Sequence, residues 1–199
     1  MIKAEETDQV GETPRKEIIW AAAELFMDLG FSATSIDAIA ERMGATKGRV
    51  YHYYSSKADI YFDIQREAMR RLTSVIDPIA RSDAPVRDRL LAMARAHCDI
   101  LLRDLPIQKV AVQGLELRVL SANGFRHAKA LREIVKLRDD YEQIFCEVID
   151  EGIREGVFED LPARMLSKPF FGALNWLTLW YRPRKLESQE DLNAIAAAL

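Results

Sequence analysis

Three helix-start signals fall close together between residues 34 and 59, and they restrict the fold more than any other feature of this sequence. Thr34-Ser35-Ile36-Asp37 and Ser56-Lys57-Ala58-Asp59 both place an acid three residues after a hydroxyl. This capping-box pattern satisfies backbone N–H groups at the start of a helix. Between the two boxes, Gly44-Ala45-Thr46 offers a turn glycine followed by a capping hydroxyl. The stretch therefore predicts two short helices joined by a tight turn, which is the helix-turn-helix arrangement.

Helical periodicity also dominates the rest of the 199 residues. Alternating runs of β-branched residues do not occur, and Gly and Pro number only 9 and 7. We therefore predict an all-α fold. Residues 1–12 are expected to form a flexible tail, 13–58 a three-helix unit and 59–199 a larger helical domain. The expected helices run from Thr13-Pro14 to Gly30, within 34–44, from Lys47 to Tyr54, from Ala58 to Ile76, near 86–103, 107–122, 126–156 and 162–182, with a loop from Pro78 to Pro85.

Positive charge is concentrated in one window of an otherwise mildly acidic chain. The net charge is −3, and 49% of residues are hydrophobic, which is enough to bury a core. Residues 1–41 carry three basic and nine acidic side chains, whereas residues 42–57 carry four basic side chains and no acid. The whole-molecule charge indicates no partner, but this window indicates an anionic one.

The segment from Lys47 to Tyr54 breaks two rules for a solvent-exposed helix. Val50 and Tyr54 lie one turn apart and are expected to pack inward, which turns Gly48 and His52 outward. Glycine costs about 1 kcal/mol in a helix relative to alanine. Basic residues in a first turn also oppose the helix dipole. Both features become favourable on a helix face that must approach DNA phosphates closely, because a missing side chain allows the approach and cations attract the phosphates.

An α-helix fits the DNA major groove, where residues near its start contact base edges. In this interpretation, Lys47, Arg49 and His52 donate to bases or phosphates, and donors at the helix starts hold phosphates. The alternative is a solvated basic face with core aromatics, and Tyr53 in particular can simply pack. The predicted DNA-binding residues are Thr34, Ser35, Thr46, Lys47, Gly48, Arg49, Tyr51, His52, Tyr53 and Lys57.

The segment 165–183 is apolar on nearly every side. A helix of this kind must be covered all round, which in a small domain requires a partner or a cavity. Together with the apolar face of the preceding helix, carried by Ile144, Phe145, Val148, Ile149 and Ile153, it predicts a four-helix interface between two copies of the chain. The alternative is that both helices only complete the core of one subunit.

Polar residues that interrupt apolar faces are the candidates for ligand contacts. Each of them is also open to interpretation as an ordinary surface or core residue. The predicted effector-binding residues are His97, Gln113, Glu116, Arg118, Phe171, Asn175, Leu179 and Arg182. No cofactor or metal is predicted, because close Cys and His clusters are missing from the sequence. Adjacent His97, Cys98 and Asp99 point to different sides of a helix and form no triad, so an enzyme is not predicted.

Cys98 and Cys146 lie far apart in sequence on apolar faces and are expected to be reduced and buried, the alternative being a disulfide or redox pair. Residues 1–11 are polar rather than a signal peptide, and no apolar stretch is long enough to span a bilayer. We therefore expect a cytoplasmic protein with no membrane partner.

Residues 14–61 resemble the DNA-binding domain of the TetR (tetracycline repressor) family. The resemblance lies in AAAELFMDLGFSATSIDAIAERMGATKGRVYHYYSSKADIY, which has the family framework of glycines, aromatics and lysine. One departure is Tyr53, where the family usually has a histidine; here the histidine is His52. The resemblance is specific and covers about a quarter of the chain.

The resemblance implies a homodimeric regulator, by default a repressor, that binds a palindromic DNA operator and is released by a small hydrophobic or amphipathic effector. The ending NWLTLWYRP is similar to a subgroup that senses acyl-CoA thioesters, so an acyl-CoA is the expected effector class. The alternative is a helical protein-interaction module without sequence-specific DNA binding.

Overall fold

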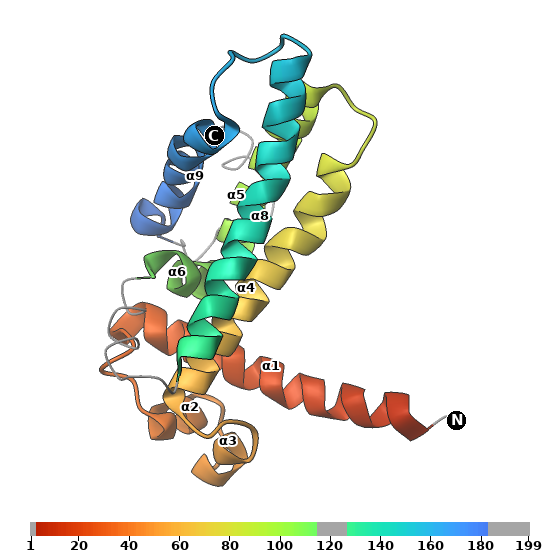
Figure 1. The fold of residues 1–199 in the computed structure, drawn as a ribbon. Coiled ribbons are helices and arrows are strands. Elements are labelled where there is room, and N and C mark those ends of the chain that lie inside the picture. The colour runs from red at the N-terminus through yellow and green to blue at the C-terminus, as the bar shows by residue number, and fades with distance from the viewer. Residues whose placement is uncertain (1–2, 115–126, 183–199) are drawn as a thin grey trace.

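The computed structural model describes residues 3–114 and 127–182, with side chains from Pro14 onward within those ranges. All regular structure in these residues is helical (Figure 1), which confirms the all-α prediction. The helices are α1 (Lys3–Leu29), α2 (Ile36–Arg42), α3 (Lys47–Tyr53), α4 (Lys57–Ala80), α5 (Val86–Arg103), α6 (Leu105–Gln113), α8 (Ala128–Arg154) and α9 (Ala163–Trp180).

Helices α2 and α3 form the predicted helix-turn-helix, and local chemistry explains their bounds. The Ser35 hydroxyl accepts a 3.0 Å hydrogen bond from the backbone N–H of Ala38 and so caps α2. Ser56 caps α4 in the same way through Asp59. Gly30 and Gly44 end the preceding helices with φ of +81° and +61°, a backbone region that side chains disfavour.

Two predicted boundaries are wrong. Helix α1 begins at Lys3, so the expected tail at 1–12 is largely helical backbone and Pro14 lies inside the helix rather than at its start. Lysine, alanine and glutamate near this end all favour helix. Helix α4 runs through Pro78 to Ala80 instead of ending at Ile76. The hydrogen bond lost at Pro78 is offset because Ile76 and Ala80 are buried.

The later helices follow the predicted ranges closely. Helix α5 has the predicted bounds, and α8 and α9 each differ from theirs by about two residues. Helix α6 begins two residues before the predicted 107 and ends at Gln113. The remainder of the predicted 107–122 helix lies mostly outside the described residues, as does the chain after 182.

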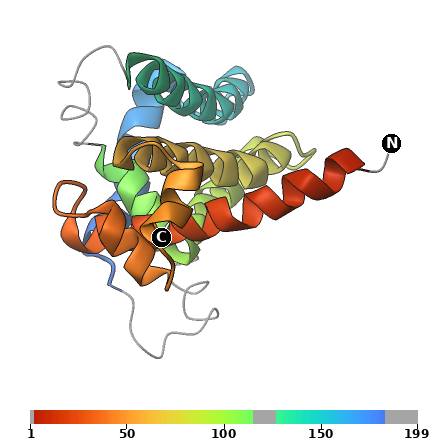
Figure 2. The same cartoon turned by 90° about the horizontal axis from the view of Figure 1, so that it is seen from below.

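Helix α4 is the central element of the molecule. Viewed from below, it lies between α8 on one side and α1 on the other, with α5 and α6 beside it (Figure 2). An aromatic group at its start joins the two parts of the chain: the ring centroid of Phe31 lies 5.3 Å from Phe26 and 5.4 Å from Tyr61. One continuous hydrophobic core therefore runs from α1–α3 into α4, α5, α6 and α8. Val50 of α3 and Tyr54, which follows it, belong to this core.

Both cysteines are free and buried, as predicted. Burial raises the pKa of the Cys98 and Cys146 thiols, which keeps them in the less reactive neutral form. Among the helices that the structure describes, none has the length and hydrophobicity needed to cross a membrane.

Candidate nucleic-acid interface and ligand pocket

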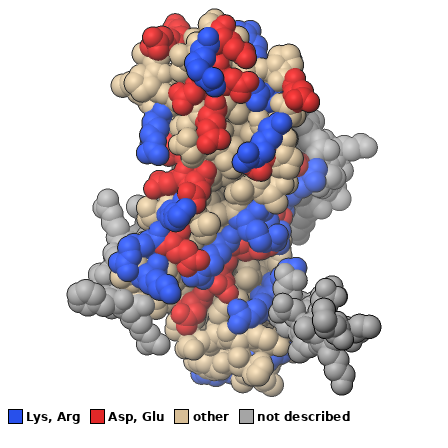
Figure 3. Space-filling model, turned by 45° about the vertical axis from the view of Figure 1, so that its right-hand side comes forward, with Lys and Arg blue, Asp and Glu red and all other residues tan. Residues whose placement is uncertain are grey.

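Helix α3 presents the face that its sequence predicts. Val50 is 0% exposed and Tyr54, at the helix end, is buried. The opposite side is open to solvent, and a Cβ added at Gly48 would meet only the Thr46 hydroxyl, at 3.9 Å. At the lower tip, where α2 and α3 lie, the face seen in Figure 3 is mostly uncharged with Lys and Arg at its rim, whereas both charge types mix over the body above. The exposed residues of this helix are Lys47, Gly48, Arg49, Tyr51 and His52.

The two cations of this face are held by exposed carboxylates. The Arg49 guanidinium lies 2.7 Å from a Glu17 oxygen on α1, and the Lys47 ammonium lies 3.0 Å from Asp37 on α2. The hydrogen bond to Asp37 raises the pKa of Lys47. Water competes with exposed pairs of this kind, so a phosphate can replace the carboxylate at little cost.

Two predicted phosphate contacts are directed inward instead. Thr34 is buried, and its hydroxyl donates to the backbone oxygens of Gly30 and Leu25. The Lys57 ammonium donates to backbone oxygens in the 31–34 loop, including Thr34 at 2.6 Å. Both side chains stabilise the turn that sets α2 against α1. The sequence identified them as helix-start donors, but carbonyls left unpaired after α1 take those donors up.

The remaining predicted residues lie around the exposed face. Thr46 stands at the N-cap of α3 with an exposed side chain and makes no side-chain cap bond. The Ser35 hydroxyl is exposed but already accepts the cap bond. Tyr53 is half-buried and packs against the core, with its ring 4.9 Å from His52. The exposed face around Gly48 therefore contains the predicted residues except for the inward-pointing side chains of Thr34 and Lys57.

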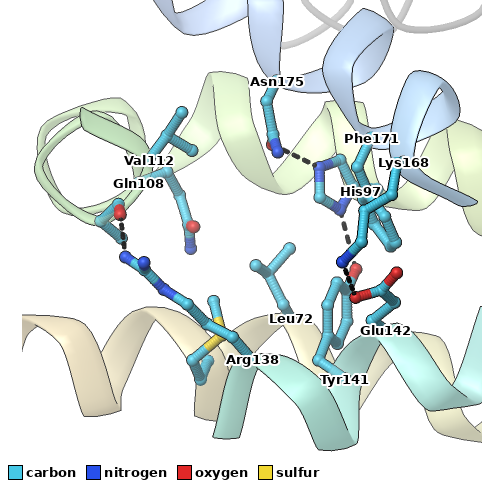
Figure 4. Close-up of a pocket in the computed structure, with 12 residues that line it drawn as sticks. Leu72, His97, Gln108, Val112, Arg138, Tyr141, Glu142, Lys168, Phe171 and Asn175 are labelled. Atoms are coloured by element: carbon cyan, nitrogen blue, oxygen red, sulfur yellow. Dashed lines mark hydrogen bonds and ion pairs between the residues drawn. The ribbon is translucent and has the colours of Figure 1, made fainter. Parts of the chain in front are cut away.

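A pocket of about 230 Å³ lies among α4, α5, α6, α8 and α9, in the part of the molecule away from α3. Apolar side chains of α4 form its middle, and polar groups gather at its two ends (Figure 4). The lining residues are Met69, Leu72, His97, Gln108, Ala111, Val112, Arg138, Tyr141, Glu142, Lys168, Phe171 and Asn175.

One wall of the pocket is a hydrogen-bonded row centred on His97. Its Nδ1 lies 2.8 Å from the Tyr141 hydroxyl, and its Nε2 lies 3.1 Å from Oδ1 of Asn175. Burial lowers the pKa of His97 to about 4, against which the bond to Asn175 acts only weakly. Burial also raises the pKa of Tyr141, so the phenol keeps its proton. The row is therefore neutral, with Tyr141 donating to Nδ1 and Nε2–H donating to Asn175.

The pocket contains only part of the set predicted to bind an effector. Of that set, His97, Phe171 and Asn175 line the pocket. Gln113, Leu179 and Arg182 are exposed and do not line it, because the helical positions chosen for them face outward. Glu116 and Arg118 lie outside the described residues.

Sequence reasoning missed most of the polar lining. Gln108 on α6 and Arg138, Tyr141 and Glu142 on α8 lie on faces whose partners are distant in sequence. Lys168 on α9 hydrogen-bonds Glu142 across 26 residues. The α8 residues at 138, 141 and 142 follow helical spacing. A polar stripe of this kind on a helix with a strong apolar face was the one signal in the sequence that could have identified them as pocket residues.

Comparison with known proteins identifies the family. The description "Bacterial regulatory proteins, tetR family" matches residues 18–64, and "Tetracyclin repressor-like, C-terminal domain" matches residues 83–199. The chain belongs to the TetR family. It is therefore a transcription regulator of that family, and the resemblance seen in residues 14–61 is confirmed.

Several relatives of this TetR-family chain have named roles. It is 26% identical over 166 residues to the fatty acid metabolism regulator protein of Bacillus subtilis (strain 168), covering 82% of this chain and 81% of that protein. It is 26% identical over 178 residues to the transcriptional repressor KstR2 of Rhodococcus jostii (strain RHA1), covering 88% and 84%. The structure of AibR in complex with isovaleryl coenzyme A and operator DNA has the same fold, with a TM-score of 0.73, 20% identity and coverage of 94% and 97%.

Proposed function

We propose that this regulator is a repressor that binds a palindromic operator as a homodimer and leaves it when an acyl-CoA thioester binds the pocket. The observation that carries the DNA part is the solvent-exposed, acid-free face of α3 above a fully buried Val50. The three-helix unit at 13–58 acts as the reader and residues 59–199 as the effector and dimer domain. The N-terminal part of α4 belongs to the core of both.

Recognition rests on Arg49 and Lys47 at the start of α3. Once they leave Glu17 and Asp37, they can donate to guanine edges or phosphates, and Tyr51 and His52 extend the same face. Thr46 adds an N-cap hydroxyl for a phosphate. Replacing one base-reading arginine typically costs about 1–3 kcal/mol of affinity.

The test begins by selecting the preferred duplex from a random pool with the purified protein. Arg49→Ala should then weaken binding to that duplex by roughly tenfold or more, a loss of about 1–3 kcal/mol. Arg87→Ala, at an exposed arginine on α5, is the matched control and should leave affinity unchanged. Affinity should also fall steeply with salt because phosphate contacts release counterions. Equal affinity for selected and random duplexes would support the interaction-module alternative instead.

Dimerisation is assigned to α9, which leaves a continuous apolar stripe exposed. Trp176 is 62% and Trp180 51% exposed, and Met165 and Leu179 continue the stripe. Gly172 lies in the middle, where an added Cβ would meet nothing within 4 Å, so a second helix can approach closely. A monomer exposing such a stripe is unfavourable, and two copies would cover it. Phe145, Val148 and Ile149, predicted for the interface from sequence, are instead buried within the subunit.

The dimer is tested by Trp176→Glu, which places a charge in the stripe. Light scattering should show a dimer for the wild type and a monomer for the variant, and DNA affinity should fall with the dimer. Leu91→Glu is the control, because Leu91 is equally an exposed apolar side chain but lies on α5. If both variants stay dimeric, α9 is not the interface.

An acyl-CoA effector is supported by the pocket and by the relatives. The pocket has an apolar middle suited to a hydrocarbon chain, and AibR has been solved with isovaleryl coenzyme A. Its volume of about 230 Å³ is below the roughly 300–1,000 Å³ that enclose whole drug-sized ligands. The acyl chain therefore enters while the nucleotide stays outside.

Helix α4 is the proposed lever between pocket and DNA. Its Met69 and Leu72 line the pocket, and its second turn is bonded to the residue that follows α3: the Tyr54 hydroxyl donates to Asp63 at 2.9 Å. Arg66 joins Asp63 at 2.6 Å and Glu133 of α8 at 2.8 Å. A ligand that separates α8 from α4 would thus shift α3, and a preference of about 2.7 kcal/mol for the shifted state would weaken operator binding 100-fold.

Calorimetric titration with thioesters of increasing chain length tests the effector class. Binding should occur with one site per subunit, and the same thioesters should release the selected duplex. Free coenzyme A is the control and should do neither. Absence of heat and of release across all chain lengths would refute the acyl-CoA proposal while leaving DNA binding intact.

A further inference from the structure

Two fully buried glutamines lie where α4 meets α6, and only one of them has partners for both its amide nitrogen and its amide oxygen. Gln65 on α4 donates to the backbone oxygen of Val110 at 3.2 Å, and its Oε1 accepts from Arg138 at 3.0 Å. Gln108 on α6 is also 0% exposed, but its Nε2 makes only a 3.5 Å contact with the Ala68 oxygen. Its Oε1 has no partner among the described residues. A buried acceptor without a donor is costly, and this one lines the pocket.

Arg138 supplies donors beside that unpaired oxygen. It crosses from α8 to α6, where its guanidinium donates to the Ala111 oxygen, one helical turn from Gln108. Figure 4 shows the heads of Arg138 and Gln108 together at one end of the pocket. The partners described for Arg138 are neutral oxygens, and burial lowers its pKa. This end therefore offers a cationic donor and an unpaired acceptor to the same ligand group.

The two ends of the pocket differ in their access to water. Lys168 and Glu142 lie at the end opposite Gln108, with Leu72 between (Figure 4), and the Lys168 side chain is 69% exposed. Gln108, at the opposite end, is 0% exposed, so the Lys168 end is the mouth of the pocket and Gln108 lies at its enclosed end. A thioester whose nucleotide remains outside would direct the far end of its acyl chain toward Gln108 and Arg138.

We propose that this inner end recognises a hydroxyl group on the distal part of the effector's acyl chain. The inference rests on the proposed acyl-CoA function and specifies the effector. The hydroxyl donates to Gln108 Oε1 and accepts from the Arg138 guanidinium, so one small group satisfies both. A methyl end leaves both unpaired. A carboxylate end satisfies Arg138 but places its oxygens against the Gln108 oxygen.

Three thioesters with the same six-carbon chain test this directly: hexanoyl-CoA, 6-hydroxyhexanoyl-CoA and adipoyl-CoA, which end in a methyl, a hydroxyl and a carboxylate. Calorimetry on the full-length protein should rank the hydroxyl compound tightest, by tenfold or more over hexanoyl-CoA, since a site built to bond a hydroxyl discriminates against its absence. The matching four- and eight-carbon sets find the length that spans the pocket.

Gln108→Leu is the diagnostic variant. It removes the unpaired oxygen and keeps Arg138, so the advantage of the hydroxyl should shrink and adipoyl-CoA should gain relative to wild type. Glu155→Leu, at an exposed residue after α8, is the control and should preserve the wild-type ranking. A thermal melt establishes that each variant is folded. The wild-type ranking is decisive even where Gln108→Leu does not fold.

The outcomes separate this inference from the proposed function. If the methyl-ended thioester binds as tightly as its hydroxylated counterpart at every chain length, and releases the operator, the inference fails and the acyl-CoA function stands. A water molecule then hydrogen-bonds to the Gln108 oxygen. If adipoyl-CoA binds tightest, the inner end recognises an anion and the hydroxyl assignment is overturned. If no thioester binds, the proposed effector class fails and this inference with it.

Discussion

The face of α3 and the pocket among α4, α5, α6, α8 and α9 both carry polar groups in a helical framework, but they hold those groups in opposite ways. On α3 the charged side chains are exposed and paired with carboxylates that water or phosphate can replace. At the His97 wall of the pocket the polar groups are instead buried or half-buried and bonded to one another across the fold, as His97 is to Tyr141 and Asn175. Substitutions at the first site should therefore change binding with little effect on folding, whereas substitutions at the second should change both.

The difference follows from desolvation. An exposed ion pair is weak because water competes with each partner, and it can exchange partners quickly. A buried polar group has no water to return to, so losing its partner costs about 1–3 kcal/mol. A DNA-binding face needs ion pairs that exchange partners easily, whereas a selective ligand site needs polar groups for which losing a partner is costly.

The largest contrast should come from an aromatic residue packed behind the pocket wall and one on the face of α3. Phe145 is fully buried and packs with Phe171 at a ring distance of 4.8 Å, so Phe145→Ala should lower the free energy of unfolding by about 3–5 kcal/mol. Tyr51 on α3 is 47% exposed, and Tyr51→Ala should change stability by less than about 0.5 kcal/mol. Urea unfolding of both variants measures the contrast. Equal losses would contradict the division between the two regions.

Acid should destabilise the pocket region through His97. Its folded pKa of about 4 is below the ordinary 6.5, so the unfolded state binds a proton that the folded state rejects. The stability it contributes is present above pH 6.5 and is lost as pH falls toward 4, by up to about 3 kcal/mol. The nearest partners, Tyr141 and Asn175, do not titrate in that range.

Comparison with His97→Gln isolates this effect, because all other titrating groups are retained. The difference in unfolding free energy between wild type and variant should narrow as pH falls from 6.5 to 4. A constant difference across this range would show that His97 stays accessible to protons in the folded state.

The cap of α2 should give a smaller effect. Ser35→Ala removes the acceptor for the Ala38 N–H and should lower stability by about 1 kcal/mol. DNA affinity should fall with it, because α2 positions α3. Ser35→Asp, which restores an acceptor, should recover stability in chemical denaturation but not affinity, since it adds a negative charge near the DNA.

The α3 face was easier to predict from the sequence than the pocket, because its contacts are more local in sequence. Ser35 and Ser56 were identifiable as caps because their partners lie three residues away, and the face of α3 followed from helical spacing alone. The bond from His97 to Asn175 joins residues 78 apart, and Arg138 reaches Ala111 across 27 residues. Such pairs depend on how helices pack, which local patterns do not encode. Lys57 is directed inward for the same reason, because its acceptors lie in the 31–34 loop, 23 or more residues away. Thr34 is directed inward because its hydroxyl donates to the Gly30 oxygen, at the turn that follows α1.

The smallest expected effect on stability is at the Arg49–Glu17 pair. Glu17→Gln should change the free energy of unfolding by less than about 1 kcal/mol, because both side chains are more than 40% exposed. It should nevertheless raise affinity for the selected duplex a few-fold at low salt, since Arg49 no longer leaves a carboxylate to reach the DNA. The gain should shrink as salt increases. Arg49→Ala combined with Glu17→Gln should show no such gain, because the carboxylate acts only through the arginine. If the gain persists in the double variant, Glu17 repels the DNA directly, and the α3 face extends onto α1.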